Sequence, residues 1–191
     1  MRKFAGLQEP DMQHQIEMVQ TESGLLVPAG LKVGGVFHGL IKRNGVVIDE
    51  FEMPNLVVNQ GLDHILNVAF NGATQVPTWY LGIFEGNYTP VASLTAATVA
   101  SSSTECTTYT PSTRPEFVEA ASTAQSITNS ASRASFVMTA AKTVHGAFLI
   151  SSNVKSGTAG TLFSATRFAT PKALEISDEL LLTYTFNASS V

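Results

Sequence analysis

Charged side chains, cysteine and long apolar runs are all scarce in this sequence, and each shortage excludes a class of protein. Charged residues make up only 14% of the 191 residues, against roughly 25% in an average soluble domain. Because neutralising phosphates needs clustered Lys and Arg, a chain with so little charge and a net charge of -4 is not expected to bind nucleic acid. The single cysteine, Cys106, excludes an intrachain disulfide and a cysteine-rich metal site.

The apolar segments and the first residues of the chain give no sign of a membrane or secretory role. No segment approaches the roughly 18 consecutive apolar residues of a membrane span. Arg2 and Lys3 are followed by polar residues where a signal peptide would need an apolar run. We therefore expect a globular protein made inside the cell, with no membrane partner and a surface that is polar but mostly neutral.

The first 35 residues differ from the rest of the chain. They hold few large apolar residues in any sustained period, and Pro10, Pro28 and several glycines interrupt the pattern. We predict an extended N-terminal arm over residues 1–35, which orders against a partner, followed by one β domain over residues 36–191. A frayed terminus is the alternative, and a helical turn over Met12–Val19 also fits the spacing.

A β-hairpin is the first clear element. The segments Val36–Arg43 and Val46–Phe51 flank Asn44-Gly45, which is the strongest two-residue signal for a type I′ turn. The register that this turn sets places Ile41 opposite Ile48 and Phe37 opposite Glu52. One face of this hairpin is therefore expected to be only partly apolar.

The next segment, Gln60–Phe70, carries the period of an amphipathic helix. Asn59 is a suitable N-cap residue, and Asn71-Gly72 is a suitable helix end. This is the only helix that the pattern predicts. Its apolar positions lie one helical turn apart and are Leu62, Ile65, Leu66 and Ala69.

After the helix the apolar period changes to two, which is typical of strands. Short strands separated by Ser, Asn and Gly turns predict a mainly β fold, an antiparallel β-sandwich or jelly roll, with one short helix at about 60–70 and the extended arm. The Ser- and Thr-rich residues 93–113 fit either a linker or an edge strand. The expected strands are Trp79–Phe84, Glu116–Ala120, Gln125–Thr128, Ser135–Ala140, Thr143–Ser151, Thr161–Ser164 and Glu179–Asn187.

No pattern in the sequence indicates a catalytic, cofactor-binding or metal-binding residue. The histidines are far apart and have no metal-ligand spacing. Residues 156–161, SGTAGT, lack the Gly-Lys-Ser/Thr ending of a phosphate loop, so a hairpin loop is the better interpretation. The G-x-S-x-G motif is absent, and we predict that the protein is not an enzyme and uses no cofactor. The four histidines are His14, His38, His64 and His145.

Two clusters of carboxylates are candidates for an acid/base pair, since a glycosidase needs only two carboxylates for catalysis. Strand alternation sends Glu50 and Glu52 to one face of the hairpin and Asp49 to the other. Asp178 lies at a turn before Glu179, where aspartate commonly bonds its own backbone. We therefore interpret both groups as solvated faces and turns rather than as a catalytic site.

Six segments follow one another in a recognisable order along the chain. They are NLVVNQGLDHILNVAFNGATQ (55–75), TWYLGIF (78–84), TRPEF (113–117), SITNSASRASFVMTA (126–140), VHGAFLISSNVKSGTAGTLFSATRF (144–168) and DELLLTYTF (178–186). This order resembles a family of small proteins encoded among the structural genes of tailed bacteriophages and prophages. The resemblance runs from about residue 36 to the end of the sequence and leaves out the arm.

The resemblance implies a component of the virion, made in the cytoplasm of the host bacterium. Its expected partners are the major capsid protein or other virion proteins, and we expect a homo-oligomer. The first hypothesis is a capsid decoration or cement protein that bridges neighbouring capsid subunits, with the arm reaching across an interface. Apolar arm residues without an obvious partner in the chain support this reading: Phe4, Leu7, Ile16, Leu25 and Leu26.

Two alternatives remain open. The first is a tail, collar or fibre component of the virion. The second is a carbohydrate-binding module for host recognition, because jelly rolls often bind sugars through exposed aromatic rings. For the two rings inside a strand, Trp79 and Tyr80, the burial preferences of aromatic residues favour core packing over that role. The available rings are Trp79, Tyr80, Tyr88 and Tyr109.

Overall fold

The computed structural model of the chain describes residues 18–20, 26–28 and 31–190. The chain divides into two units, one of residues 33–187, which we call the body, and one of residues 1–32 and 188–191. In the second unit, β1 (Met18–Gln20) pairs antiparallel with β2 (Leu26–Pro28). The helical turn expected over Met12–Val19 is therefore wrong at its end, and the rest of that segment lies outside the described residues, as do the apolar side chains of the arm.

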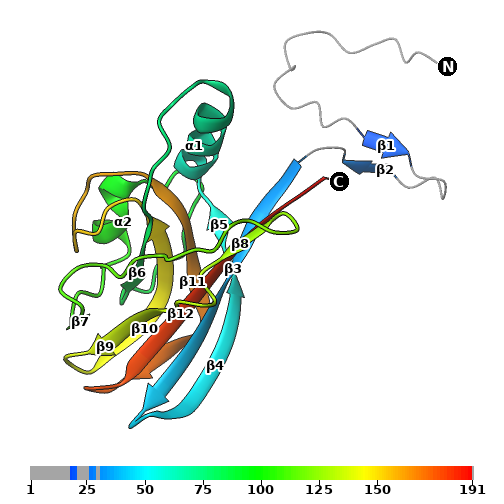
Figure 1. The fold of residues 1–191 in the computed structure, drawn as a ribbon. Coiled ribbons are helices and arrows are strands. Elements are labelled where there is room, and N and C mark those ends of the chain that lie inside the picture. The colour runs from blue at the N-terminus through cyan, green and yellow to red at the C-terminus, as the bar shows by residue number, and fades with distance from the viewer. Residues whose placement is uncertain (1–17, 21–25, 29–30, 191) are drawn as a thin grey trace, which may run out of the picture. The chain divides into compact units, whose positions relative to one another are not determined.

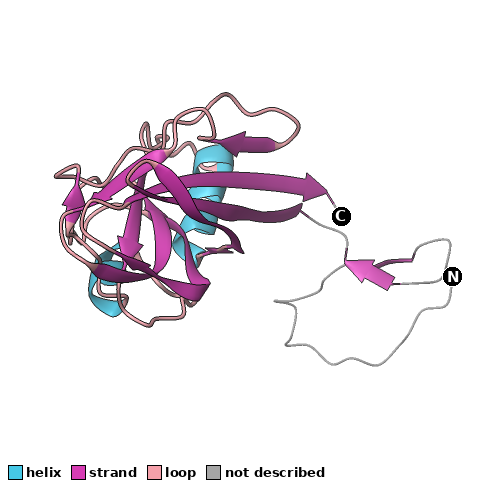
Figure 2. Ribbon diagram, turned by 90° about the horizontal axis from the view of Figure 1, so that it is seen from below, coloured by secondary structure: helices cyan, strands magenta, loops and turns pink. Residues whose placement is uncertain are grey.

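The body is mainly β, as predicted, and its two antiparallel sheets are consistent with a β-sandwich (Figures 1 and 2). The smaller sheet has the strand order β5-β11-β10-β6, formed by Leu56–Val57, Leu162–Leu174, Lys142–Ile150 and Tyr80–Phe84. The larger sheet has the order β4-β3-β12-β9-β7, with β8 also paired to β12. Its strands are Val46–Pro54, Leu31–Arg43, Glu179–Ser190, Ala134–Met138, Tyr109–Thr110 and, for β8, Ser126–Thr128.

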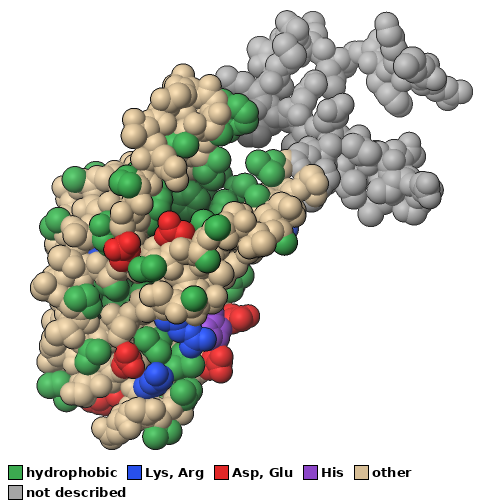
Figure 3. Space-filling view, in the orientation of Figure 1, with side chains coloured by type: hydrophobic (Ala, Val, Ile, Leu, Met, Phe, Trp, Pro, Cys, Tyr) green, Lys and Arg blue, Asp and Glu red, His purple; other side chains and the backbone are tan. Residues whose placement is uncertain are grey.

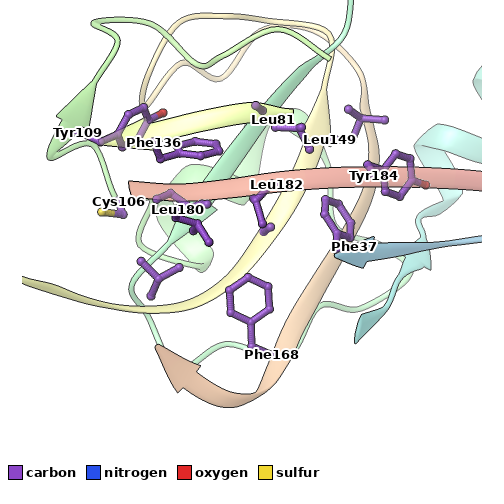
Figure 4. Close-up of a cluster of buried hydrophobic side chains, with 14 of the residues drawn as sticks. Phe37, Leu81, Cys106, Tyr109, Phe136, Leu149, Phe168, Leu180, Leu182 and Tyr184 are labelled. Atoms are coloured by element: carbon purple, nitrogen blue, oxygen red, sulfur yellow. The ribbon is translucent and has the colours of Figure 1, made fainter. Parts of the chain in front are cut away.

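The main hydrophobic core lies between the two sheets (Figure 4). Strand β12 contributes Leu180, Leu182 and Tyr184 to it, all 0% exposed, as expected for alternate residues that face one side of a sheet. Phe37 from β3 packs against Tyr184 with ring centroids 4.6 Å apart. Opposite them, the smaller sheet supplies inward-facing residues such as Leu149.

A second core covers the outer face of the smaller sheet. Alternate residues of β10 divide between the two cores, since Leu149 faces the first while Phe148 and Ile150 face the second. Helix α2 (Ala96–Ser102) packs there through Ala96 and Val99. This burial on both faces explains why β10 reads as a nearly continuous apolar run.

Helix α2 was not predicted, because the Ser- and Thr-rich segment 93–113 favoured a linker or an edge strand. The helix begins with a capping box in which the side chains of Thr95 and Thr98 satisfy each other's backbone N–H groups. The Gln60 side chain adds a further cap, because its Oε1 accepts hydrogen bonds from the N–H groups of Ala96 and Leu162, both at 2.9 Å. Tertiary contacts thus decide the structure of a locally ambiguous sequence.

The predicted hairpin is confirmed, but its predicted register is wrong. Asn44 and Gly45 both have positive φ, 51° and 78°, as a type I′ turn requires. A β-bulge then shifts the ladder, so that Ile41 pairs with Asp49 instead of Ile48. The shift keeps Ile41 in the core and leaves Ile48 49% exposed.

Helix α1 (Asn59–Phe70) is confirmed almost to the residue. Its N-cap is Val58, which makes no side-chain cap bond, so the expected cap at Asn59 is wrong. The predicted end is correct: Gly72 has φ 65°, and the Ala73 N–H donates to the Asn67 carbonyl at 3.1 Å.

The remaining strand predictions hold with changed limits. Strands β6, β8, β9, β10, β11 and β12 all occur, and β11 extends to Leu174, well beyond the predicted Ser164. Residues 116–120 are not a strand, because only Glu116 forms an isolated bridge, to Tyr80. In the described part of the chain, neither helix has the length and apolarity needed to cross a membrane.

Candidate functional site: an apolar pocket under helix α1

Helix α1 is held against the smaller sheet by a bulge in β11. Leu162 and Ser164 pair with consecutive residues of β10, which leaves Phe163 as an extra residue. Its carbonyl is free to accept a hydrogen bond from the Val58 N–H at 3.1 Å, at the start of the helix. Gly61 lies directly against the same carbonyl, where a Cβ atom would clash with it. The bulge therefore fixes where the helix begins.

Below the helix lies a cavity of about 350 Å³, which we call the helix pocket. Its lining comes from helix α1, from strands of both sheets, and from residues within the segments 75–79 and 117–119. Figure 3 shows apolar surface in the hollow beneath the lobe that carries the helix. The lining residues are His64, Ile65, Val68, Ala69, Gln75, Val76, Trp79, Phe117, Glu119, Ile127, Leu149, Phe163, Tyr184 and Phe186.

Aromatic rings give the pocket its shape. Phe163 contacts Trp79 and Phe186 edge to face, with centroid distances of 5.4 and 5.1 Å. The ring of His64 stands edge-on to Trp79 at 5.3 Å. Edge-to-face contacts of this kind fix ring orientations, so the pocket is preformed.

The pocket has few polar groups. The Tyr184 hydroxyl accepts a hydrogen bond from the Asn55 side chain at 2.9 Å, and burial raises its pKa. It therefore stays neutral at physiological pH. Among the described residues that line the pocket, Glu119 and His64 are the only titratable groups besides this hydroxyl. Such a lining selects an apolar occupant.

Two large apolar side chains of the same helix remain in solvent. Leu66 is 56% exposed and Phe70 is 85% exposed. The helical pattern predicted Leu66 as a core residue, but only Leu62 and Ile65 of that face pack against the core. The helix thus presents apolar surface to solvent next to the residues with which it lines the pocket.

A second hollow, of about 490 Å³, lies beside Tyr80, and we call it the tyrosine groove. Its lining is more polar than that of the helix pocket. The residues are Tyr80, Pro111, Thr113, Arg114, Pro115, Glu116, Val118, Ser132, Arg133, Ala134, Ser135 and Asn153.

Arg114, one of the lining residues of this groove, forms an ion pair with Glu105 that the sequence did not reveal. The guanidinium of Arg114 donates two hydrogen bonds to the Glu105 carboxylate, each 2.8 Å long, and the two side chains are 0% and 1% exposed. Arg114 also donates to the Ser152 carbonyl at 2.9 Å, and Glu105 accepts from the Ser156 N–H at 2.7 Å. The pair therefore joins loops that are far apart in the sequence.

Four of the carboxylates considered in the sequence take part in separate contacts with basic side chains. Asp178 lies at a turn, as predicted, and accepts a hydrogen bond from the Glu175 N–H at 2.8 Å. It is nevertheless buried, and its bidentate bonds to Arg43, 2.9 and 2.7 Å long, hold its pKa below the usual value. Asp49 pairs with Lys172 at 2.8 Å. The pairs with Arg43 and Lys172 join segments that are far apart in the sequence.

The other residues considered in the sequence lie apart from one another. His38 bonds Glu50 at 2.7 Å, His145 is half-buried in β10, and His14 lies outside the described residues. Residues 156–161 lie in the loop between β10 and β11, as predicted. Cys106 is fully buried, and burial raises the pKa of its thiol. Within the described ranges, no group of three or more His, Cys, Asp or Glu could hold a metal ion.

Comparisons with known proteins add no relative. No model of a protein family matches the chain, and no curated protein matches it.

Proposed function

We propose that the protein is a structural component of a tailed-phage virion, and specifically a capsid decoration protein that bridges neighbouring capsid subunits. The order of sequence segments from 55 to 186 supports the proposal that the protein is a virion component. The helix pocket supports the mode of action, because a preformed apolar cavity beside exposed Leu66 and Phe70 suits a protein–protein contact. In this proposal an apolar segment of the capsid protein inserts under α1.

Repetition makes this contact effective. A pocket of about 350 Å³ accepts only a few side chains, so one contact is weak. A homo-oligomer on a symmetrical shell engages many such contacts together, and linked weak contacts add to a strong attachment. The low charge of the protein suits an interface in which copies of one surface lie near each other.

The experiment measures how much protein binds to phage particles lacking it. Phe70→Ser removes the most exposed apolar side chain of α1 without touching the core, and Ile176→Ser, 65% exposed in the turn before β12, is the matched control. We expect Phe70→Ser to lower occupancy at least tenfold at limiting protein, while the control binds like the wild type. Equal occupancy for all three proteins would contradict a contact at α1.

A tail, collar or fibre component remains the second candidate, since the same pocket could serve a different virion partner. The number of copies per particle distinguishes the two positions, because shell proteins are present in far more copies than tail proteins.

A further inference from the structure

The tyrosine groove carries an aromatic ring that the two cores do not use. Tyr80 is the first residue of β6, and its neighbours Trp79 and Leu81 point into the main core. Phe84, on the same side of the strand as Tyr80, packs in the second core. Tyr80 belongs to neither cluster and lines the groove instead, half-buried. Its ring is thus held by the strand while remaining accessible.

Unused hydrogen-bonding groups surround this ring. The Ser135 hydroxyl in the lining donates to Glu179 at 2.7 Å, but a carboxylate, a guanidinium, an amide and three further hydroxyls of the groove form no side-chain hydrogen bond or ion pair with the described residues. The side chains are Tyr80, Thr113, Glu116, Ser132, Arg133 and Asn153. Several donors and acceptors around one ring suit a ligand that has both a carbon–hydrogen face and many hydroxyl groups.

The charges of the groove cancel. Glu116 and Arg133 are its free charged side chains among the residues described, and the charge of Arg114 is matched by Glu105 at 2.8 Å. A groove for phosphate or for an acidic peptide would need a net positive charge. The balance therefore favours an uncharged ligand.

We propose that the tyrosine groove is a carbohydrate-binding site for a neutral sugar unit of a glycan. A pyranose ring places its C–H face on Tyr80, an interaction of the weak C–H to aromatic kind, while its hydroxyls bond Glu116, Arg133 and Asn153. The volume of about 490 Å³ lies within the range of small-molecule sites and suits a mono- or disaccharide. This site is separate from the helix pocket and does not depend on the proposed virion function.

Of the four rings considered in the sequence, the structure thus favours one. Tyr109 is only 3% exposed, and Tyr88 packs against the second core. Trp79 contributes to the helix pocket, where no comparable set of polar groups surrounds it. Tyr80 alone of these four combines an accessible ring with free polar neighbours.

The test uses the full chain and defined sugars. Wild-type protein is titrated with glucose, galactose, mannose, N-acetylglucosamine, maltose and lactose by saturation-transfer NMR and calorimetry, and it is screened on an array of neutral bacterial surface glycans. We expect at least one of these sugars to bind with a Kd in the millimolar range or tighter. Absence of binding in all three measurements would overturn the proposal.

Variants then locate the binding. Tyr80→Ala should weaken it at least tenfold, whereas Tyr80→Phe keeps the ring and should retain most of it. Arg133→Gln changes an exposed side chain, so it tests the site without risk to folding, and Arg167→Gln, at an exposed position of β11 outside the groove, is the matched control. Arg133→Gln should weaken binding severalfold and Arg167→Gln should not. Sugar binding that is unchanged in Tyr80→Ala and Arg133→Gln would place the sugar elsewhere and refute this site.

Discussion

The helix pocket and the tyrosine groove are built in opposite ways on one sandwich. The helix pocket is a continuation of the main core, and its walls are apolar rings such as Trp79 and Phe163. The tyrosine groove lies over loops that a fully buried ion pair, Arg114–Glu105, holds together. Packing therefore shapes the first hollow and buried charge supports the second, so the two should respond differently to substitution.

The largest effect is expected where one charge of the buried pair is removed. Arg114→Met leaves the Glu105 carboxylate buried without a cation, and we expect the free energy of unfolding to fall by about 3–5 kcal/mol. Chemical denaturation measures this loss. The double variant Arg114→Met/Glu105→Gln should recover much of it, because no buried charge is then left unpaired. A loss below about 1 kcal/mol in the single variant would show that charge does not support the groove.

Neighbouring rings on opposite sides of β6 allow the two hollows to be compared directly. Trp79→Ala removes a ring that packs against Phe163, so we expect destabilisation of about 3 kcal/mol. Tyr80→Ala removes a ring that lies in neither core, and about 1 kcal/mol is expected. Thermal or chemical denaturation measures both values. A larger loss in Tyr80→Ala would mean that Tyr80 is a packing residue rather than a ring reserved for a ligand.

The packing of helix α1 against β11 should be sensitive to one methyl group added at Gly61. In Gly61→Ala the new Cβ collides with the carbonyl of Phe163, and we expect a loss of about 1–3 kcal/mol despite the higher helix propensity of alanine. Gly34→Ala is the control, because no atom lies within 4 Å of the Cβ position there. Equal stability of the two variants would show that the helix moves freely on the sheet.

The smallest effect is expected at the pair Arg43–Asp178, because the Arg43 side chain is 43% exposed and solvent screens its charge. The pKa of Asp178 is lowered from its ordinary value of 3.8, so its contribution to stability is present above that pH. The contribution is lost as the pH falls through the still lower pKa of the folded state. The stability difference between wild type and Asp178→Asn should thus be constant from neutral pH to about pH 5 and should shrink below 3.8. A difference that grows in acid would contradict this.

The sequence predicted those parts of the fold that depend on neighbouring residues. Asn44-Gly45 marks a hairpin, Gly72 ends a helix, and alternation along β12 identifies its buried face, all through local backbone and side-chain geometry. The pairing registers of the strands could not be predicted where a bulge intervenes, as at Ile48 and Phe163, because the extra residue carries no local signature.

The candidate sites depended on contacts between distant segments. The helix pocket combines residues from 64 to 186, and nothing in their spacing brings them together. Arg114 and Glu105 lie in loops whose approach is decided by the sheets. Helix α2 had a local signal in Thr95 and Thr98, but the hydrogen bond that the Ala96 N–H donates to the Gln60 side chain at its start is tertiary. For Tyr80 the sequence favoured core packing over a sugar-binding role, whereas the structure places its side chain in neither core.

The number of copies in a particle tests the central proposal most directly. Virions of a phage that encodes this chain are purified, and the molar ratio of the protein to the major capsid protein is measured by quantitative mass spectrometry. A decoration protein predicts a ratio close to a simple stoichiometry with the major capsid protein. A ratio that corresponds to only a few copies per particle would indicate a tail component instead. Absence of the protein from purified virions would contradict the proposed function.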